Sequence, residues 1–294
     1  MVARSELDVI TPRTLDEALD FLRREEKGTK IIAGGSDLIV QLRDGIIQPS
    51  KLLNILALKD LRFIKNSTGT IRIGALTTYT DIVHDEITRK HGWVLAQAAK
   101  QIGAVQLQNT ATIGGNLGNA SPAGDSLPPL YALDATVVIQ NKFSKREIPI
   151  EQFFVGYRKT ALRPDELIRE VHFQALGPND RAAYRKLGLR EANAISIVDV
   201  AVVLRDRRQD NSFGTIRIAL GAVAPTIRRA RKCEQELGNK PLTKKSIEEA
   251  SAHASQNADP IDDIRGSAEY RRAALTSLVF QTLYDAALQE AHEH

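Results

Sequence analysis

Cysteine is almost absent from this chain of 294 residues, in which Cys233 is the only one. A single thiol cannot close an internal disulfide, and it cannot supply the four thiolates of an ordinary iron–sulfur cluster. We expect Cys233 to be a small residue on a basic helix. The chain therefore has neither a disulfide scaffold nor an iron–sulfur cluster of its own.

Aromatic residues and long apolar runs are also scarce. Phe, Trp and Tyr make up 5% of the chain, so its core must be mainly aliphatic. The longest clean apolar run, about 200–204, is far shorter than the ~20 residues of a membrane span, and the first residues lack the apolar stretch of a secretory signal. With 43% hydrophobic and 26% charged residues, we expect a soluble, cytoplasmic globular protein.

Several signatures of catalysis and binding are missing as well. The six histidines show no metal-binding spacing, and no serine- or cysteine-nucleophile motif is present. Neither the GxGxxG fingerprint nor a Walker loop occurs. The net charge is +4, and the arginine clusters near 205–208 and 228–232 have no interleaved aromatics, which argues against nucleic-acid binding. We expect no metal ligands and no catalytic acid or base in this chain.

The length predicts two or three domains, and the pattern of residues changes along it. The first 55 residues read as β-α-β, with Thr14 and Glu17 at the spacing of a capping box. Strands are expected at 70–74 and 136–140 and a helix at 93–103. The tract 110–129 reads as a long irregular segment, which in a compact domain usually binds something. The last third predicts strands followed by helices over 228–237, 244–257 and 267–291.

Two glycine pairs could bind an anion. The first lies in 31–38 between a strand and a helical turn; the second is Gly114-Gly115, followed by Asn116 and Asp125. Glycine lets the backbone approach a ligand, and a helix start offers free N–H groups. Two such segments about 80 residues apart could hold one diphosphate from both sides. Each could equally be a tight turn or loop without a ligand.

Basic residues in 184–190 form a third candidate. Lys186 and Arg190 could stabilise negative charge on a phosphate or an electron-rich ring. A cationic strand end that faces water is an equally good interpretation of this segment taken alone.

Together these segments resemble the FAD-binding (medium) subunit of molybdenum hydroxylases, the family that contains xanthine dehydrogenase and aerobic carbon monoxide dehydrogenase. Residues 33–38, 112–125 and 184–190 are similar to its AGG loop, its TIGGN…SP…D segment and its YxK…R stretch. The resemblance runs from about residue 8 to 290, with further matches at 73–78, 156–160, 164–166 and 266–272. The TIGGN…SP…D segment is its most specific part.

The resemblance implies an α+β fold. A two-part FAD-binding unit of the vanillyl-alcohol-oxidase type would comprise an N-terminal α/β subdomain, 1–58, and a second subdomain, 59–180. Residues 181–294 would form a C-terminal domain like that of the carbon monoxide dehydrogenase flavoprotein, with a three-stranded antiparallel sheet and a helical bundle.

The resemblance also implies a set of FAD-binding residues. Backbone amides would hold the diphosphate, Asp125 would take sugar or ribityl hydroxyls, and Lys186 would stabilise the reduced ring. Ile102 and Leu162 fall where relatives contact FAD, and Ile195 where an apolar side chain often covers the flavin. The diphosphate residues are Ile31, Ile32, Ala33, Gly34, Gly35, Ser36, Asp37, Leu38, Thr112, Ile113, Gly114, Gly115 and Asn116.

The implied function is electron transfer. A large partner subunit would hold the molybdenum cofactor and a small one two [2Fe–2S] clusters, and FAD here would pass electrons to NAD, a quinone or oxygen. The assembly would be a dimer of heterotrimers. Residues 192–196 lack the tyrosine that some members place against the flavin, so the electron acceptor stays open. A self-contained FAD oxidase or reductase, and a non-redox nucleotide-binding module, are the alternatives.

Overall fold

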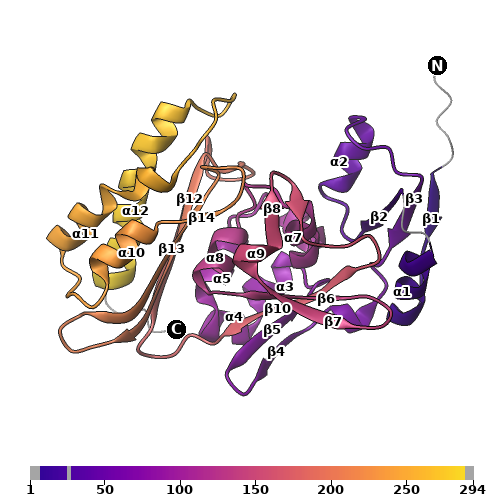
Figure 1. Ribbon diagram of the computed structural model, residues 1–294, viewed down its shortest axis with the longest axis horizontal. Coiled ribbons are helices and arrows are strands. Elements are labelled where there is room, and N and C mark those ends of the chain that lie inside the picture. The colour runs from indigo at the N-terminus through magenta and orange to yellow at the C-terminus, as the bar shows by residue number, and fades with distance from the viewer. Residues whose placement is uncertain (1–6, 25–27, 289–294) are drawn as a thin grey trace.

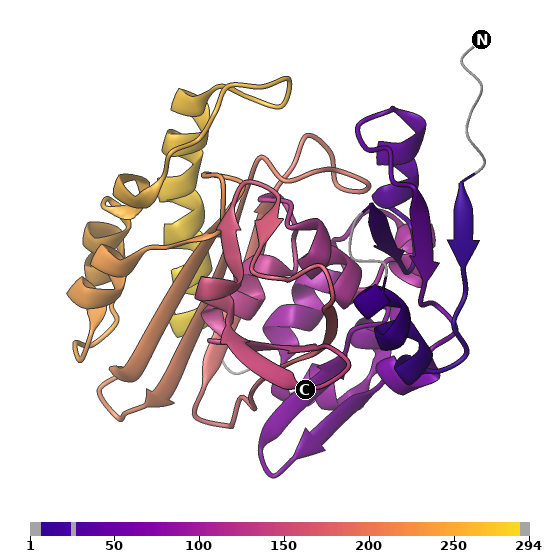
Figure 2. The same cartoon turned by 45° about the vertical axis from the view of Figure 1, so that its right-hand side comes forward.

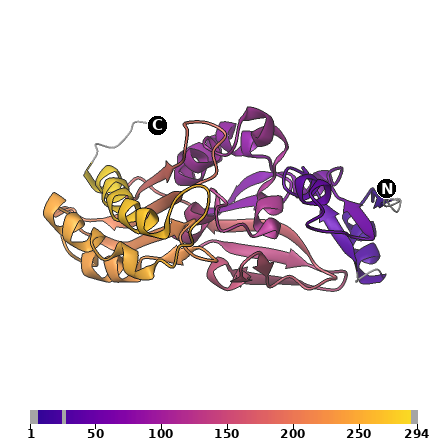
Figure 3. The same ribbon diagram turned by 90° about the horizontal axis from the view of Figure 1, so that it is seen from above.

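The computed structural model describes residues 7–24 and 28–288, which form three main β-sheets with helices packed beside them. Figures 1 and 3 show the three parts in a row, from the N-terminal unit (indigo) to the C-terminal helices (yellow). The combination of a parallel sheet, antiparallel sheets and separate helices confirms the predicted α+β class. Within the described ranges, no helix combines the length and apolar character needed to cross a membrane.

The N-terminal unit is the predicted β-α-β arrangement. β1 (Asp8–Ile10) and β2 (Thr29–Ile32) lie on either side of β3 (Lys51–Asn54) and pair with it in parallel. The apolar face of α1 (Leu15–Arg24) is buried. The Thr14 hydroxyl accepts the Glu17 N–H at 3.1 Å, but the Glu17 carboxylate accepts the N–H of Arg13, so half of the expected capping box forms. α2 (Leu38–Arg43) follows β2 closely.

The middle unit is a five-stranded antiparallel sheet with helices over one face. The strand order is β4 (Ile64–Ser67), β5 (Thr70–Gly74), β10 (Leu167–Gln174), β6 (Thr136–Gln140) and β7 (Lys145–Pro149). The main core lies between the sheet and the helices. The helices are α3 (Tyr79–His84), α4 (Glu86–His91), α5 (Trp93–Ala99), α6 (Val105–Thr110), α7 (Ile113–Asn119) and α8 (Leu127–Ala132). Short elements complete the unit: η1 (Lys59–Leu61), α9 (Ile150–Phe153), β8 (Phe154–Gly156) and β9 (Lys159–Thr160).

The tract 110–129 is more regular than its sequence indicates. It contains α7 and the first turn of α8, although glycine has a low helix propensity. Contacts hold α7 in place: a Cβ atom added to Gly114 would lie 2.6 Å from the Ala75 Cβ, so the helix packs directly on the end of β5. Tertiary packing therefore overrides local propensity here.

The C-terminal unit has one more strand than expected. β11 (Arg181–Leu187), β12 (Val198–Arg207) and β13 (Phe213–Gly221) form an antiparallel sheet, and the two-residue β14 (Arg228–Arg229) pairs with its edge. The helix predicted at 228 therefore begins later, as α10 (Arg231–Leu237). It is followed by α11 (Lys244–Ser251), η2 (Ala254–Asn257) and α12 (Ala268–Leu288). Residues 289–291 of the last predicted helix lie outside the described residues.

The lone thiol is part of the C-terminal core. Cys233 is fully buried on α10, and its thiol donates a hydrogen bond to the Ala250 carbonyl oxygen at 3.1 Å. Burial raises the pKa of Cys233 to about 12, so the thiol is unreactive at neutral pH. Its surroundings fit the interpretation of Cys233 as a small packing residue.

The two faces of the C-terminal sheet pack against different partners. Val198, Val200 and Val202 lie in the core shared with α10–α12. Tyr184, Ala201 and Ala219 lie in the main core, beside α5 and α8 of the middle unit. This second face brings the end of β11 next to the segment that follows α7.

Candidate functional site

The first glycine segment leaves β2, enters α2 and lies directly on the end of α6. A Cβ atom added to Gly34 would stand 1.7 Å from the Thr110 carbonyl oxygen, an approach that only glycine permits. Gly35 has φ +73°, in the left-handed region. The backbone N–H groups of residues 34–38 make no hydrogen bond within the described part of the chain, and these residues are all at least partly exposed. The segment therefore offers a run of free donors at the start of a helix.

The second glycine segment is the first turn of α7, where the amides are already engaged. The Thr112 hydroxyl accepts the Gly115 N–H at 3.1 Å. The N–H groups of Ile113 and Gly114 donate to carbonyls that follow β5, at 3.1 and 2.9 Å. The segment thus differs from the sequence-based picture of two amide loops. It presents the exposed face of Gly115 and the positive end of a short helix.

Hydrogen-bonded polar side chains connect α2, which follows the first glycine segment, to the last residue of α7. Asn119, the last residue of α7, accepts hydrogen bonds on Oδ1 from Gln41 Nε2 at 2.9 Å and from Arg158 Nη1 at 3.1 Å. Gln41 belongs to α2, and Arg158 lies between β8 and β9. Arg158 also interacts electrostatically with Asp37. A cation therefore lies beside the two glycine segments, where an anionic group would be stabilised.

The segment 124–126 connects α7 to the C-terminal sheet. Ser126 Oγ donates to Asn116 Oδ1 at 2.9 Å, which holds Asp125 next to the first turn of α7. Asp125 Oδ2 accepts a hydrogen bond from Lys186 Nζ at 2.6 Å, and Asp125 Oδ1 accepts one from Ser196 Oγ at 2.5 Å. Both oxygens of the predicted hydroxyl acceptor therefore already have a partner, so a ligand hydroxyl must use their remaining lone pairs.

Lys186 lies at the buried end of this arrangement. Its side chain is 5% exposed, and its ammonium also donates to the Gln101 carbonyl oxygen at 3.0 Å. An ammonium has three N–H donors, so one remains for a ligand after these two bonds. These two bonds within the protein hold the Lys186 ammonium in place without the cofactor.

A second buried carboxyl accompanies the ion pair. Asp199 lies opposite Lys186 in the ladder between β11 and β12, and its Oδ2 accepts the Tyr184 hydroxyl at 3.1 Å. Burial and the nearby Asp125 raise the pKa of Asp199 well above its usual value. Burial also raises the pKa of Asp125, although Lys186 and Ser196 oppose the shift. Of the two carboxyls, Asp125 is the one that contacts the Lys186 ammonium directly.

The three apolar residues that are predicted to contact FAD differ in how far they are buried. Ile102 is partly buried against the main core, one residue after Gln101. Ile195 is 63% exposed and precedes Ser196, on a loop whose Asn193 N–H donates to the Gly103 carbonyl oxygen at 2.9 Å. Figure 2 shows this loop between β11 and β12 at the same side of the molecule as α2. Leu162 lies in the segment between β9 and β10, where it packs on the main core.

Other residues at the site escaped the sequence reasoning. Arg158 and Ser196 each lie in a segment that the family resemblance covers, but nothing in their spacing indicated contacts with residues 39 and 71 positions away. Tyr184 belongs to the YxK…R match, which assigns it no role, and Asp199 reads as an ordinary strand residue. Arg190, by contrast, donates to the Asn193 carbonyl oxygen at 2.6 and 3.0 Å, so it supports the loop between β11 and β12.

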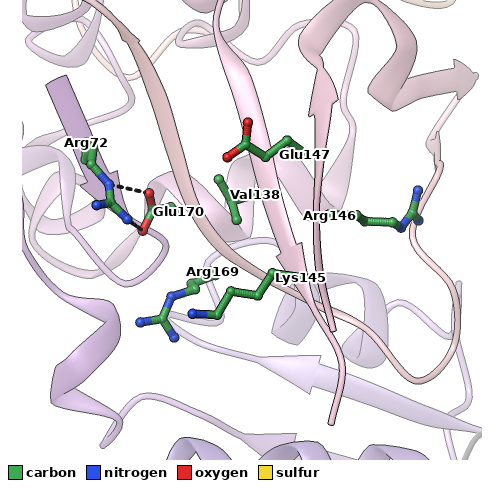
Figure 4. A pocket seen from close by; sticks show the side chains of 7 residues that line it. All are labelled: Arg72, Val138, Lys145, Arg146, Glu147, Arg169 and Glu170. Atoms are coloured by element: carbon green, nitrogen blue, oxygen red, sulfur yellow. Dashed lines mark hydrogen bonds and ion pairs between the residues drawn. The ribbon is translucent and has the colours of Figure 1, made fainter. Parts of the chain in front are cut away.

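Two cavities lie outside the glycine segments. One of about 370 Å³ lies on the face of the five-stranded sheet away from the helices, where Arg72 and Glu170 form a bidentate ion pair (Figure 4). Lys145 and Arg169 extend into the same cavity. The other, about 320 Å³, opens at the edge of β11 and is lined by Gln101, Tyr184, Arg185, Lys186, Leu278 and Asp285. This second cavity adjoins the buried ion pair.

These features fit a dinucleotide that has an anionic centre and an electron-rich ring. Free backbone donors at residues 34–38 and the open side of Gly115 suit a diphosphate. The buried Lys186 suits a ring that gains negative charge on reduction. The contacts through Asn116 and Asp125 link the two ends. In FAD, these groups occur in this order.

Comparison with known proteins gives the family. Residues 5–173 match the model of the FAD binding domain in molybdopterin dehydrogenase, and residues 182–286 match that of the CO dehydrogenase flavoprotein C-terminal domain. The chain is 31% identical to the carbon monoxide dehydrogenase medium chain of Hydrogenophaga pseudoflava over 272 residues, covering 92% of this chain and 94% of that one. It is 32% identical to a putative xanthine dehydrogenase FAD-binding subunit of Escherichia coli over 276 residues, 93% of each.

The fold agrees with these matches. A carbon monoxide dehydrogenase structure from Hydrogenophaga pseudoflava superposes with a TM-score of 0.92 at 30% identity, covering 97% of this chain and 98% of that one. Quinoline 2-oxidoreductase from Pseudomonas putida shares the fold, with a TM-score of 0.90 at 23% identity and coverage of 97% and 98%. The chain therefore belongs to the FAD-binding subunits of the molybdenum hydroxylase family, and its cofactor is FAD.

Proposed function

We propose that this chain carries electrons from a partner [2Fe–2S] subunit to a soluble acceptor, NAD or a quinone, while a large molybdenum subunit oxidises the substrate. Support comes from the relatives, which are named as medium chains or FAD subunits of dehydrogenases. The chain also has no thiolates for a cluster, because Cys233 is its only cysteine. The predicted boundaries at 58/59 and 180/181 and the dimer-of-heterotrimers stoichiometry belong to the same proposal.

The observation that carries this proposal is the buried Lys186, which Asp125 connects to the first turn of α7. FAD, when bound, supplies a store for two electrons that can be filled one at a time. The chain's own residues bind and orient: residues 34–38 donate to the diphosphate, and Gly115 lets it approach α7. Lys186 keeps one N–H for the ring and would stabilise negative charge there. Asp125 fixes the ammonium without removing its third donor.

Exposed apolar side chains indicate where the electron donor docks. Val105, Leu189, Ile195 and Ile264 are 65%, 68%, 63% and 101% exposed. Their segments meet beside the ion pair, because Asn193 binds the Gly103 carbonyl and Arg265 donates to the Ser196 carbonyl at 2.9 Å. Grouped apolar exposure of this kind is typical of a protein interface. We propose that the [2Fe–2S] subunit covers this surface.

Electron transfer in a reconstituted complex tests the proposal. The isolated chain should contain FAD without molybdenum or iron, and its flavin should be reduced by an organic substrate only after the two partner subunits are added. Leu189→Asp should slow this reduction and weaken assembly. Phe143→Asp is the matched control, because Phe143 is 81% exposed in the turn between β6 and β7. Reduction of the isolated chain by substrate would instead establish a self-contained oxidase.

A further inference from the structure

Asp199 lies in a closed, polar-poor position in the centre of the C-terminal sheet. It is fully buried on β12, with Lys186 opposite on β11 and Gly221 opposite on β13. Its Oδ1 has no hydrogen-bonding partner among the residues that the structure describes. A Cβ atom added to Gly221 would meet this oxygen at 2.2 Å and Pro128 Cγ at 2.8 Å. The oxygen therefore faces a glycine and a proline.

The charged groups around Asp199 would not neutralise both Asp125 and Asp199 if both were ionised. β11 contributes Lys186 and Tyr184, and the segment before α8 contributes Asp125. Lys186 contacts Asp125 at 2.6 Å, so this cation is already paired. Neither Gly221 of β13 nor Pro128 of α8 is titratable.

The nearest further cations have other partners. Arg265 and Arg271 donate to the carbonyl oxygens of Ser196 and Ile197, and both form ion pairs with Asp263. Neither arginine contributes to the electrostatics of Asp199, so an ionised Asp199 would have no counterion of its own beside Lys186, which already contacts Asp125. A buried charge without a counterion is strongly destabilising, and a neutral carboxyl is much less so.

We propose that Asp199 holds a proton and is a positioning residue for the flavin site. As a neutral acid, it leaves Lys186 with a single carboxylate, Asp125, so that the ammonium keeps its place and its free donor. This proposal rests on the proposed function, because it concerns the charge presented to FAD. The Tyr184 hydroxyl links Asp199 to the site: it binds Asp199 directly and interacts with Asp125 and Ser196.

The cavity at the edge of β11 brings solvent close to this acid. Tyr184 and Lys186 both line the cavity, and Tyr184 donates the hydrogen bond to Asp199. We expect Asp199 to exchange its proton with solvent from this side. Ionisation at high pH would add a negative charge beside Asp125 and oppose electron uptake by the flavin. The reduction potential of the wild type should then fall with pH more steeply above the pKa of Asp199 than below it.

Infrared spectroscopy of the protein without FAD tests the proton directly. At neutral pH the wild type should show a carboxylic-acid C=O band that Asp199→Asn removes, and the band should shift to higher frequency in Tyr184→Phe because a hydrogen bond is lost. Asp134→Asn, which changes a half-exposed carboxylate outside this cluster, is the comparison variant and should retain the band. A wild-type spectrum identical to that of Asp199→Asn in this region would overturn the proposal.

The potential of the FAD-loaded chain provides the second measurement. The flavin reduction potential of Asp199→Asn should equal that of the wild type at neutral pH, and it should lack the steeper fall of the wild-type potential at high pH. A dependence of the potential on pH that is the same in both proteins would contradict a role of Asp199 at the flavin. The two readouts separate the proposals. A chain with the acid band that fails to bind FAD would refute the proposed function alone, whereas an FAD-binding chain without the band would refute only the role of Asp199.

Discussion

Replacement of Gly115 by alanine should separate cofactor binding from folding. A Cβ atom at Gly115 meets only the Thr112 Oγ1, at 3.0 Å, a tight contact that a small shift of this hydroxyl would relieve. Alanine is favoured over glycine inside a helix by about 1 kcal/mol, which offsets the cost of this shift, so the free energy of unfolding should change little. The same methyl group would project where the diphosphate approaches α7. Overpacking typically costs 1–3 kcal/mol, or about 10- to 100-fold in the Kd for FAD.

Gly118→Ala is the matched control on the same helix. Its Cβ would lie 3.8 Å from Ile168 Cδ1, an ordinary contact on the side of the helix towards the sheet. The gain in helix propensity is the same, but FAD affinity should not change. Fluorescence titration of the apoprotein with FAD and urea unfolding measure the two effects. If Gly115→Ala binds FAD as tightly as Gly118→Ala, the diphosphate does not lie over α7.

Three further predictions concern the same framework. Lys186→Met should shift the flavin potential to more negative values, and should lower the free energy of unfolding by about 3–5 kcal/mol because Asp125 loses its buried partner; redox titration and urea unfolding measure these. Gly34→Ala should weaken both FAD binding and the N-terminal unit, because its Cβ would lie 1.7 Å from the Thr110 carbonyl oxygen; FAD titration and limited proteolysis measure these. Burial raises the pKa of Asp263, but hydrogen bonds and charge from two neighbouring arginines outweigh it and lower this pKa to about 2. Its contribution to stability, on the order of 1–2 kcal/mol, is therefore complete above the unfolded pKa of about 4 and is lost as pH falls towards 2, which urea midpoints against pH will show.

Each of these has its own control. The double variant Asp125→Asn with Lys186→Met should recover much of the stability but not the potential; recovery of both would show that the potential follows the fold. Gly45→Ala is the control for Gly34→Ala. Gly45 has φ +70°, and a Cβ atom added there would meet no atom within 4 Å. The substitution therefore introduces backbone strain alone and should leave FAD affinity unchanged. Asp263→Asn should reduce the loss of stability at acid pH. A pH dependence of the urea midpoint that equals that of the wild type would show that Asp263 does not cause this loss.

The elements that sequence reasoning located correctly are those whose pattern is local. The strand at 136–140 is found at these residues because the consecutive β-branched residues 136–139 favour a buried strand. The helix α1 follows from its apolar spacing and its cap. The segment 113–119 could not be found in this way, because its glycines disfavour a helix and packing on Ala75 compensates for them.

The site was predicted in outline but not in its electrostatics. Glycine pairs and the family resemblance identified the backbone segments and Lys186. The sequence does not reveal that Asp125 neutralises Lys186, because the two residues are 61 positions apart and meet only through the packing of α8 on the C-terminal sheet. Nor does it reveal which amides of the glycine segments remain free, since this depends on the carbonyls of Ala75 and Thr77, after β5, that accept from α7.

The most direct test of the account is the stoichiometry of FAD on the purified chain. We expect one non-covalently bound FAD per chain, with a flavin absorbance spectrum that bleaches on reduction with dithionite and returns in air. Heat-released FAD should rebind to the apoprotein with the same stoichiometry. A colourless chain that binds no FAD at micromolar concentrations after correct folding is verified by circular dichroism would contradict the central claim.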